Sequence, residues 1–370
     1  MLGTTLGGYR LVSELGSGAM GSVYLAEDTA GRQVAVKVIH PHLLASPGVF
    51  KRFLREGEIG KRIRHQNVVR TLDVDASEAN GTMALFMVME YVEGRSLRRL
   101  LKDLRMVPEA LLREIAGQIA AGLAAVHAEG IIHRDLKPEN VLITEDRRIR
   151  IMDLGVARMQ EASIALTREG HFTGSLPYAA PEQFNREEVG PAADLYSLGV
   201  LLYELATGRN PFAGQNAAQV INTHLSLTPP PVEEQNPAIS SFFSEVIGAL
   251  LVKKPADRIE SAAALGCVLA DGERSDWWAG RRRRLRRKEQ SLPRIPVRRD
   301  TAAHGRETEL SVLHQAWNEA KEGRGRALLL EGEPGVGKTR LVDSFLRSLV
   351  DQDVHMLYGC YLPSGGMGGL

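Results

Sequence analysis

This sequence of 370 residues contains only two cysteines. It also lacks a long apolar run and a large net charge. The two cysteines, Cys267 and Cys360, lie far apart, which excludes a disulfide framework and favours a reducing compartment. We interpret both as small apolar filler residues. The formal net charge is only +1, which excludes a general electrostatic preference for nucleic acid or anionic membranes.

Apolar stretches are too short for membrane insertion. The longest, such as residues 83–89 and 198–202, have the length of buried strands or helix cores, whereas a helix that spans a bilayer needs about 20 apolar residues. Residues 1–10 lack the charged and then apolar pattern of a signal peptide. We therefore expect a cytoplasmic protein without a transmembrane segment.

The hydrophobic pattern changes once within the first 270 residues. Short β-branched runs at residues 9–15, 23–26, 33–40 and 82–89 predict strands, and residues 49–63 predict an intervening helix. After Ser96, apolar residues recur at three- and four-residue steps, as in Leu112, Ile115, Ile119, Leu123 and Val126, and predict a helix that ends near Gly130. Further strands are expected at residues 141–143 and 149–152, and further helices at about 192–207, 238–252 and 261–269. This pattern predicts an α+β fold with a β-rich lobe over about 9–90 and an α-rich lobe over about 91–270.

The composition shifts after Asp271. The basic run from Arg281 to Lys288 precedes two prolines, Pro293 and Pro296, so we interpret residues 271–300 as a solvated linker. Binding of anionic lipid or nucleic acid by this run, next to Trp277 and Trp278, is the alternative, but no adjacent apolar helix supports an anchoring role.

Glycines cluster between the first two predicted strands, in the run Gly16-Ser17-Gly18-Ala19-Met20-Gly21. Alone, this spacing is weak evidence for a phosphate-binding loop. Here it leads into a strand rather than a helix, which argues against a dinucleotide-binding fold. Glycines also let the backbone approach phosphate oxygens closely.

Lys37 ends the strand run Val34-Ala35-Val36-Lys37. A lysine here could place its charge on the α- and β-phosphates of a nucleotide. Such a lysine needs an acidic partner, for which we choose Glu56, with Glu58 as the alternative.

Three further motifs follow in order: the stretch His133-Arg134-Asp135-Leu136-Lys137-Pro138-Glu139-Asn140, then Asp153-Leu154-Gly155, then Ala180-Pro181-Glu182. With the glycine run and Lys37, this set resembles that of the bacterial eukaryotic-like (Hanks-type) serine/threonine protein kinases. The resemblance covers residues 9–270 and implies the bilobal kinase fold. Leu154 stands where the family usually has Phe.

The resemblance implies a role for each matching residue. Asp135 would orient or accept the proton of a Ser or Thr hydroxyl of a protein substrate, and Lys137 would add positive charge at the γ-phosphate of ATP. Asn140 and Asp153 would hold Mg²⁺, with Mn²⁺ as an alternative. The expected nucleotide-contacting residues, with Met89 as gatekeeper, are Gly16, Ser17, Gly18, Ala19, Met20, Gly21, Val23, Ala35, Lys37, Met89, Glu90, Val92, Asn140 and Asp153.

The resemblance also implies architectural and regulatory residues. Glu182 would pair with Arg258, and Asp194 would bond the backbone of the catalytic loop. The run Gly174-Ser175-Leu176-Pro177-Tyr178 resembles the substrate-side loop of the family, with Ser175 where Thr is usual. Arg134 is typical of kinases whose activation segment is ordered by a phosphate. We expect autophosphorylation there, on Thr167 first, then Thr173, with Ser163 also present, and self-association could serve it.

A second nucleotide motif lies near the C-terminus. The run Gly332-Glu333-Pro334-Gly335-Val336-Gly337-Lys338-Thr339 fits a P-loop between an expected strand at residues 327–330 and a helix at 340–349. Lys338 would reach the β- and γ-phosphates, and Thr339 would ligate Mg²⁺. With His304-Gly305-Arg306-Glu307 ahead of it, this region resembles AAA/STAND-type ATPases.

We interpret residues 301–370 as an incomplete P-loop NTPase domain of α/β type. About thirty residues follow the P-loop, and they contain no apolar strand that ends in an acidic residue. We therefore expect a fragment in which this second site does not hydrolyse nucleotide.

Three functions compete at this point. An active serine/threonine kinase is favoured because Lys37, Glu56, Asp135, Asn140 and Asp153 are all present. A pseudokinase scaffold would lack at least one of these groups. A nucleotide-switched regulator, with the kinase as its output, would require a complete P-loop domain.

Overall fold

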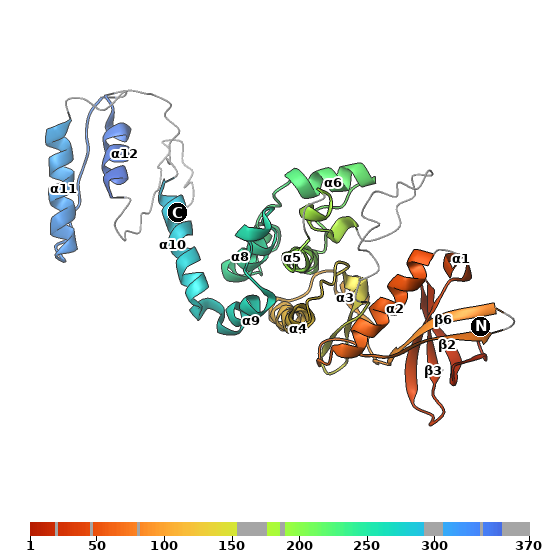
Figure 1. Cartoon of the computed structure of the whole chain (residues 1–370). Coiled ribbons are helices and arrows are strands. Elements are labelled where there is room, and N and C mark those ends of the chain that lie inside the picture. The colour runs from red at the N-terminus through yellow and green to blue at the C-terminus, as the bar shows by residue number, and fades with distance from the viewer. Residues whose placement is uncertain are drawn as a thin grey trace. The chain divides into compact units, whose positions relative to one another are not determined.

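The computed structural model of the chain describes residues 1–18, 21–44, 47–79, 82–153, 176–185, 189–291, 306–333 and 336–349. The chain divides into two compact units, Met1–Glu273 and Arg274–Leu370. Figure 1 shows the first unit as a β-rich part followed by a helical part. The two units are described separately below.

The β-rich lobe is one antiparallel sheet with the order β1-β2-β3-β4-β6-β5. Its strands are β1 (Thr5–Leu6), β2 (Tyr9–Ser17), β3 (Gly21–Glu27), β4 (Gln33–Ile39), β5 (Thr71–Ala79) and β6 (Thr82–Glu90). The short α1 (Pro41–Leu44) leads to α2 (Pro47–Arg62), which packs against β5. The strands expected around β2, β3, β4 and β6 and the helix expected around α2 are confirmed, whereas the sequence did not single out β5.

Side chains of β4 alternate between the two faces of this sheet, as the pleat requires. Val34, Val36 and Val38 belong to one apolar cluster with Phe86 and Val88 of β6. On the opposite face, Ala35 and Ile39 pack with Met87, Met89 and Phe53 of α2. Lys37 shares the register of this second face, so the fold directs it to the side that α2 covers.

The second lobe consists of helices and a small sheet. The helices are α3 (Leu97–Leu104), α4 (Glu109–Ala128), α5 (Ala192–Thr207), α6 (Ala217–Ser226), α7 (Val232–Gln235), α8 (Ser241–Leu250) and α9 (Ala262–Asp271). The small sheet has the order β7 (Arg95–Ser96), β8 (Val141–Ile143), β9 (Ile149–Ile151). Short turns of 3-10 helix are η1 (Pro138–Asn140), η3 (Leu176–Tyr178), η4 (Pro181–Gln183), η5 (Pro255–Asp257) and η6 (Gly272–Arg274).

Helix α5 is the centre of this lobe. It is buried on all sides from Ala193 to Ala206, and α4, α7 and α8 pack against it. A helix that is apolar all round belongs in a core, and its few polar side chains then need partners. Asp194, Ser197 and Glu204 are these polar residues, and each of them bonds to the site described below.

The second unit contains α10 (Asp276–Ser291), α11 (Glu307–Lys321) and α12 (Lys338–Ser348). The whole basic run therefore lies on a helix, in which the Arg281 guanidinium lies 5.6 Å from the centre of the Trp277 ring. Within the described chain, no helix has both the length and the apolar character that crossing a membrane requires.

The prediction of a strand at residues 327–330 is wrong, because these residues have no regular secondary structure. A strand is stable only when a neighbouring strand takes its backbone hydrogen bonds. Residues 306–333 and 336–349 contain no such neighbour, and the Leu329 side chain is 84% exposed.

Candidate active site

The stretch from His133 to Asn140 connects α4 to β8, and its backbone is hydrogen-bonded to Asp194 of α5. The Asp194 carboxylate is fully buried and accepts hydrogen bonds from the backbone N–H groups of His133 (2.8 Å) and Arg134 (2.7 Å). It also lies 2.8 Å from His127 Nε2. The expectation that Asp194 bonds this loop is confirmed.

Two residues of the site have strained backbones. Arg134 has a φ of 61° and Asp153 a φ of 57°, a left-handed conformation that costs free energy for residues other than glycine. The two bonds from Asp194 fix the two peptide groups directly before the strained φ of Arg134. Such outliers persist where the surrounding structure imposes them, which is common at functional sites.

Asp135 projects from this loop and is contacted by two side chains from the same motif. Lys137 Nζ donates to Asp135 Oδ2 at 3.0 Å, and Asn140 Nδ2 donates to the same oxygen at 3.0 Å. Asn140 also donates to the Asp135 carbonyl at 2.9 Å. The Asp135 side chain is only 12% exposed, so its carboxylate has a fixed orientation.

The backbone of Met152 joins this loop to Asp153. The Met152 N–H donates to the Asn140 carbonyl at 2.9 Å, and the Met152 carbonyl lies 3.1 Å from His133 Nε2. These two bonds bring Asn140 and Asp153, which are thirteen positions apart in sequence, to adjacent places.

Lys37 of β4 reaches across to Asp153. Its Nζ donates to Asp153 Oδ1 at 2.6 Å, over 116 positions of sequence. Burial alone would raise the pKa of the Asp153 carboxyl, but the Lys37 charge and hydrogen bond outweigh it and hold that pKa below its usual value. The side chain of Glu56, the partner expected for Lys37, lies outside the described side chains, and Glu58 pairs instead with Lys61 at 3.0 Å.

Three of the residues expected to contact the nucleotide lie on one face of the sheet. Ala35 stands opposite Met89 in the β4–β6 register, and Val23 packs against the same cluster from β3. Val92 follows β6 and is partly buried. The Glu90 carboxylate, by contrast, pairs with Arg150 and accepts from the Arg70 N–H at 2.7 Å, so this side chain holds β6 to the second lobe.

The glycine run joins β2 to β3. Gly18 N–H donates to the Gly21 carbonyl at 2.9 Å, and the hydroxyls of Ser17 and Ser22 lie 2.9 Å apart, while Ala19 and Met20 lie outside the described residues. A Cβ added at Gly21 would come within 2.1 Å of the Val38 carbonyl, so the sheet itself requires this glycine. A Cβ at Gly16 would meet nothing within 4 Å, so packing does not require this glycine.

Asn140 and Asp153 fit a hard divalent cation. The Asn140 amide nitrogen is used on Asp135, which leaves its Oδ1 available as a ligand oxygen, and the Asp153 carboxylate can supply a second. No group of three or more His, Cys, Asp or Glu side chains suited to a metal occurs among the described residues. Two protein oxygens match a Mg²⁺ ion that takes its remaining ligands from phosphates and water.

The end of the activation segment is anchored by a buried ion pair. The side chains of Glu182 and Arg258 are 1% and 0% exposed, and two parallel bonds of 2.7 and 2.8 Å join them. The expected pairing is confirmed. Several other residues of this region lie outside the described residues. They are Leu154 and Gly155 of the motif that begins at Asp153, and Ser163, Thr167, Thr173 and Ser175.

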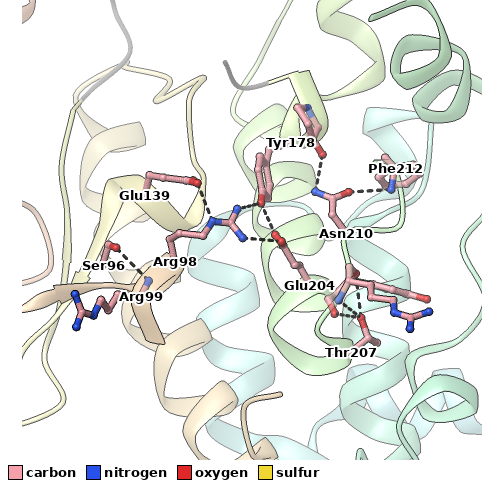
Figure 2. Close-up of polar contacts among 12 residues, drawn as sticks. Ser96, Arg98, Arg99, Glu139, Tyr178, Glu204, Thr207, Asn210 and Phe212 are labelled. Atoms are coloured by element: carbon pink, nitrogen blue, oxygen red, sulfur yellow. Dashed lines mark hydrogen bonds and ion pairs between the residues drawn. The ribbon is translucent and has the colours of Figure 1, made fainter. Parts of the chain in front are cut away.

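Sequence reasoning missed a polar network centred on Arg98 of α3. Figure 2 shows its guanidinium between Glu139 of the loop from His133 to Asn140 and the pair Tyr178 and Glu204. The bonds from Arg98 to Glu139 and to Glu204 are both 2.8 Å, and the Tyr178 hydroxyl donates to Glu204. Burial would lower the pKa of Arg98, but its hydrogen bonds to Glu204 and Glu139 raise it above the usual value. Only Glu139 could have indicated this network from the sequence, because it is a charged residue in the stretch from His133 to Asn140 to which no role was assigned.

The second nucleotide motif is partly described. Gly337 has a φ of 94°, and Lys338 begins α12 with its Nζ donating to the Glu333 carbonyl at 2.9 Å and to the Gly332 carbonyl. The lysine therefore folds back over its own loop. The Thr339 side chain, Pro334 and Gly335 lie outside what the structure describes.

Comparison with known proteins agrees with this geometry. Residues 9–267 match the protein kinase domain, and residues 304–365 match the AAA ATPase domain. The chain is 36% identical over 269 residues to the serine/threonine-protein kinase Pkn1 of Myxococcus xanthus, covering 71% of this chain and 38% of that protein. It is 38% identical over 266 residues to the serine/threonine-protein kinase drp72 of Corynebacterium efficiens, covering 70% and 50% respectively.

Among solved structures, the Mycobacterium tuberculosis PknI kinase domain superimposes with a TM-score of 0.56 at 27% identity, covering 73% of this chain and 98% of that one. The chain thus spans half or less of the two curated relatives named above but almost the whole of a solved kinase domain. The family match covers most of the chain, and the sheet and helices form the two lobes expected of it. The chain therefore belongs to the protein kinase family and carries a match to the AAA ATPase domain after its kinase domain.

Proposed function

We propose that this chain is a serine/threonine protein kinase that transfers the γ-phosphate of ATP to Ser and Thr hydroxyls of protein substrates in bacterial signalling. The proposal rests above all on the arrangement of Asp135, Lys137 and Asn140 beside the Lys37–Asp153 pair. Phosphoryl transfer requires mainly positioning and charge neutralisation, and this arrangement supplies both. Names of the curated relatives support the choice of Ser and Thr acceptors.

Asp135 is the group we assign to the acceptor hydroxyl. Its carboxylate can accept the hydroxyl proton while the oxygen bonds to the γ-phosphorus and ADP leaves. The Lys137 ammonium, 3.0 Å from Asp135 Oδ2, lies where it can also neutralise charge on the transferred group. Asn140 keeps the carboxylate oriented through its bond of 3.0 Å.

Lys37 and Asp153 are assigned to the nucleotide. The pKa of Asp153 lies below its usual value, so its carboxylate is ionised at neutral pH and suited to a cation. We propose Mg²⁺ as that cation, with Mn²⁺ as a substitute, held by Asn140 and Asp153. When bound, it would offset the charge of the phosphate oxygens. Lys37 can turn from Asp153 to the phosphates, with Glu56 as its expected partner.

Three finer assignments belong to this proposal. Autophosphorylation on Thr167 or Thr173, in self-associated chains, would regulate the kinase. We place the protein in the cytoplasm because its cysteine usage fits a reducing compartment. Gly332, Gly337, Lys338 and Thr339 would form a second phosphate-binding loop that takes no part in transfer to protein.

Transfer of labelled γ-phosphate to a Ser/Thr protein substrate tests this function. We expect label on Ser and Thr, a loss of about 10²–10⁴-fold in Asp135→Asn because a general base is removed, and unchanged transfer in Lys338→Ala. Lys338→Ala is the matched control, since it removes a lysine from the other nucleotide motif. Absence of transfer by the wild-type chain while ATP still binds would refute the proposal and favour a scaffold.

A further inference from the structure

The turn η3, which ends at Tyr178, is the described part of the loop that sequence analysis placed on the substrate side. Two of its backbone carbonyls are held by side chains of the helical lobe. Asn210 Nδ2 donates to the Pro177 carbonyl at 3.1 Å, and Ser197 Oγ donates to the Tyr178 carbonyl at 2.8 Å. Figure 2 shows the first of these bonds beside the Arg98 network. The turn is therefore held through two backbone carbonyls as well as through the Tyr178 hydroxyl.

His224 of α6 approaches the same turn from another side. Helix α6 packs against both η3 and η4, and the His224 side chain is completely buried. Its ring centre lies 4.3 Å from that of Phe212 and 5.8 Å from that of Phe184. The carbonyls of Leu176 and Pro177 lie near enough to raise the proton affinity of the imidazole.

The partners of His224 decide which ring nitrogen carries the proton. Lys253 Nζ donates to the Tyr196 hydroxyl at 3.2 Å, and an ammonium group can only donate. The Tyr196 hydroxyl proton is then free for His224 Nδ1, which lies 3.0 Å away. In a neutral imidazole with an accepting Nδ1, the proton is on Nε2.

The Nε2–H group of His224 is a hydrogen-bond donor without an acceptor among the described residues. It is buried, and no acceptor in the described part of the chain meets hydrogen-bond geometry with it. A buried donor without an acceptor is unfavourable, so a small movement that brings one into range is favoured. The carbonyls of Leu176 and Pro177, which act on this imidazole, are candidate acceptors.

We propose that His224 is a positioning residue for the protein substrate: its Nε2–H, oriented by Tyr196 and Lys253, bonds the backbone of η3 when that turn engages a substrate. This inference rests on the proposed kinase function. The bond strengthens on engagement, so it contributes to peptide binding and not to ATP binding. His224 packs against the rings of Phe184, Tyr196 and Phe212 and would act through the turn.

Steady-state kinetics test the proposal, with the best acceptor from a degenerate Ser/Thr peptide library as the probe. In His224→Phe, which keeps a buried ring, we expect KM for the peptide to rise about five- to tenfold, the factor expected for one neutral hydrogen bond, while KM for ATP stays within about twofold. His224→Gln keeps a donor near the Nε2 position and should restore most of the peptide affinity. His224→Asn keeps an acceptor near Nδ1 instead and should not.

Ser226→Ala is the matched control, because Ser226 lies at the exposed end of α6 and bonds only within that helix, to the Asn222 carbonyl. Equal peptide KM in wild type and His224→Phe, or an equal rise in both KM values, would overturn the proposal and leave a packing role.

A wild-type chain that phosphorylates no peptide would refute the proposed function, and hydrogen exchange of residues 176–180 then decides the role of His224. Faster exchange in His224→Phe but not in Ser226→Ala would support positioning of η3, and unchanged exchange would overturn it.

Discussion

The buried pair of Arg258 and Glu182 allows a quantitative prediction about stability. All five N–H donors of the Arg258 guanidinium are used. Two bonds go to the Glu182 carboxylate, and the others, of 2.8, 2.8 and 2.9 Å, go to the backbone carbonyls of Val252, Ala192 and Lys253. One side chain thus ties the end of the activation segment to the start of α5 and to the loop after α8.

Removal of each partner should have a different cost. In Arg258→Met the Glu182 carboxylate stays buried without its cation, and three carbonyls lose a donor, so we expect a loss of about 4–5 kcal/mol in the free energy of unfolding. In Glu182→Gln the guanidinium keeps the three carbonyls and one amide oxygen, so the loss should be about 2–3 kcal/mol. Arg258→Lys keeps the charge but has only three donors for five acceptor sites and should fall between these values.

Urea unfolding of the full chain, followed by intrinsic fluorescence, measures these differences. The matched control is Arg10→Met, which breaks an exposed Arg–Glu pair whose side chains are 59% and 35% exposed, and it should cost less than about 1 kcal/mol. The reasoning is refuted if Arg258→Met costs no more than this control, or if Glu182→Gln costs more than Arg258→Met.

Two further predictions concern η3 and the side chains of His224 and Tyr178. Burial, and then the Lys253 charge, lower the pKa of His224 from 6.5 to about 3, so the unfolded chain binds more protons between these values and stability falls as the pH drops below about 6.5. Between pH 7 and pH 5 the wild type should lose about 2 kcal/mol more than His224→Phe in urea unfolding, and parallel losses would contradict this. Tyr178→Phe removes the hydroxyl shared by Arg98 and Glu204 and should cost about 1–3 kcal/mol, and a thermal melt identical to wild type would show that the network contributes nothing.

Local patterns predicted much of the fold. The alternation in β4 and the apolar periodicity of α4 are short-range features, and both elements form where the sequence indicated them. The strand expected at residues 327–330 failed for a non-local reason, since a strand depends on a neighbour that its own residues do not specify. The two-residue β7 is too short to leave a periodic pattern, so its pairing with β8 could not be anticipated.

Contacts of the site divide in a similar way. The motif from His133 to Asn140 is contiguous, so the approach of Lys137 and Asn140 to Asp135 follows from a few residues of chain. Glu182–Arg258 and the Asp194 bonds came from the resemblance to a family rather than from any local pattern. The Arg98–Glu204 bond joins residues 106 positions apart, and nothing in either segment singles out these side chains. His224 is a single histidine in an ordinary helix, and only its burial and its neighbours give it a role.

The central claim is that Asp135 acts on the acceptor hydroxyl while Lys37 and Asp153 hold the nucleotide. Its most direct test measures two quantities on the same variants, the Kd for Mg·ATP and the single-turnover rate of γ-phosphate transfer to a Ser/Thr peptide. The account predicts that Asp135→Asn keeps the Kd within about threefold and slows transfer at least about 100-fold, whereas Lys37→Met weakens nucleotide binding or its orientation as well. Full transfer by Asp135→Asn, or a loss of ATP affinity as large as its loss of rate, would contradict it.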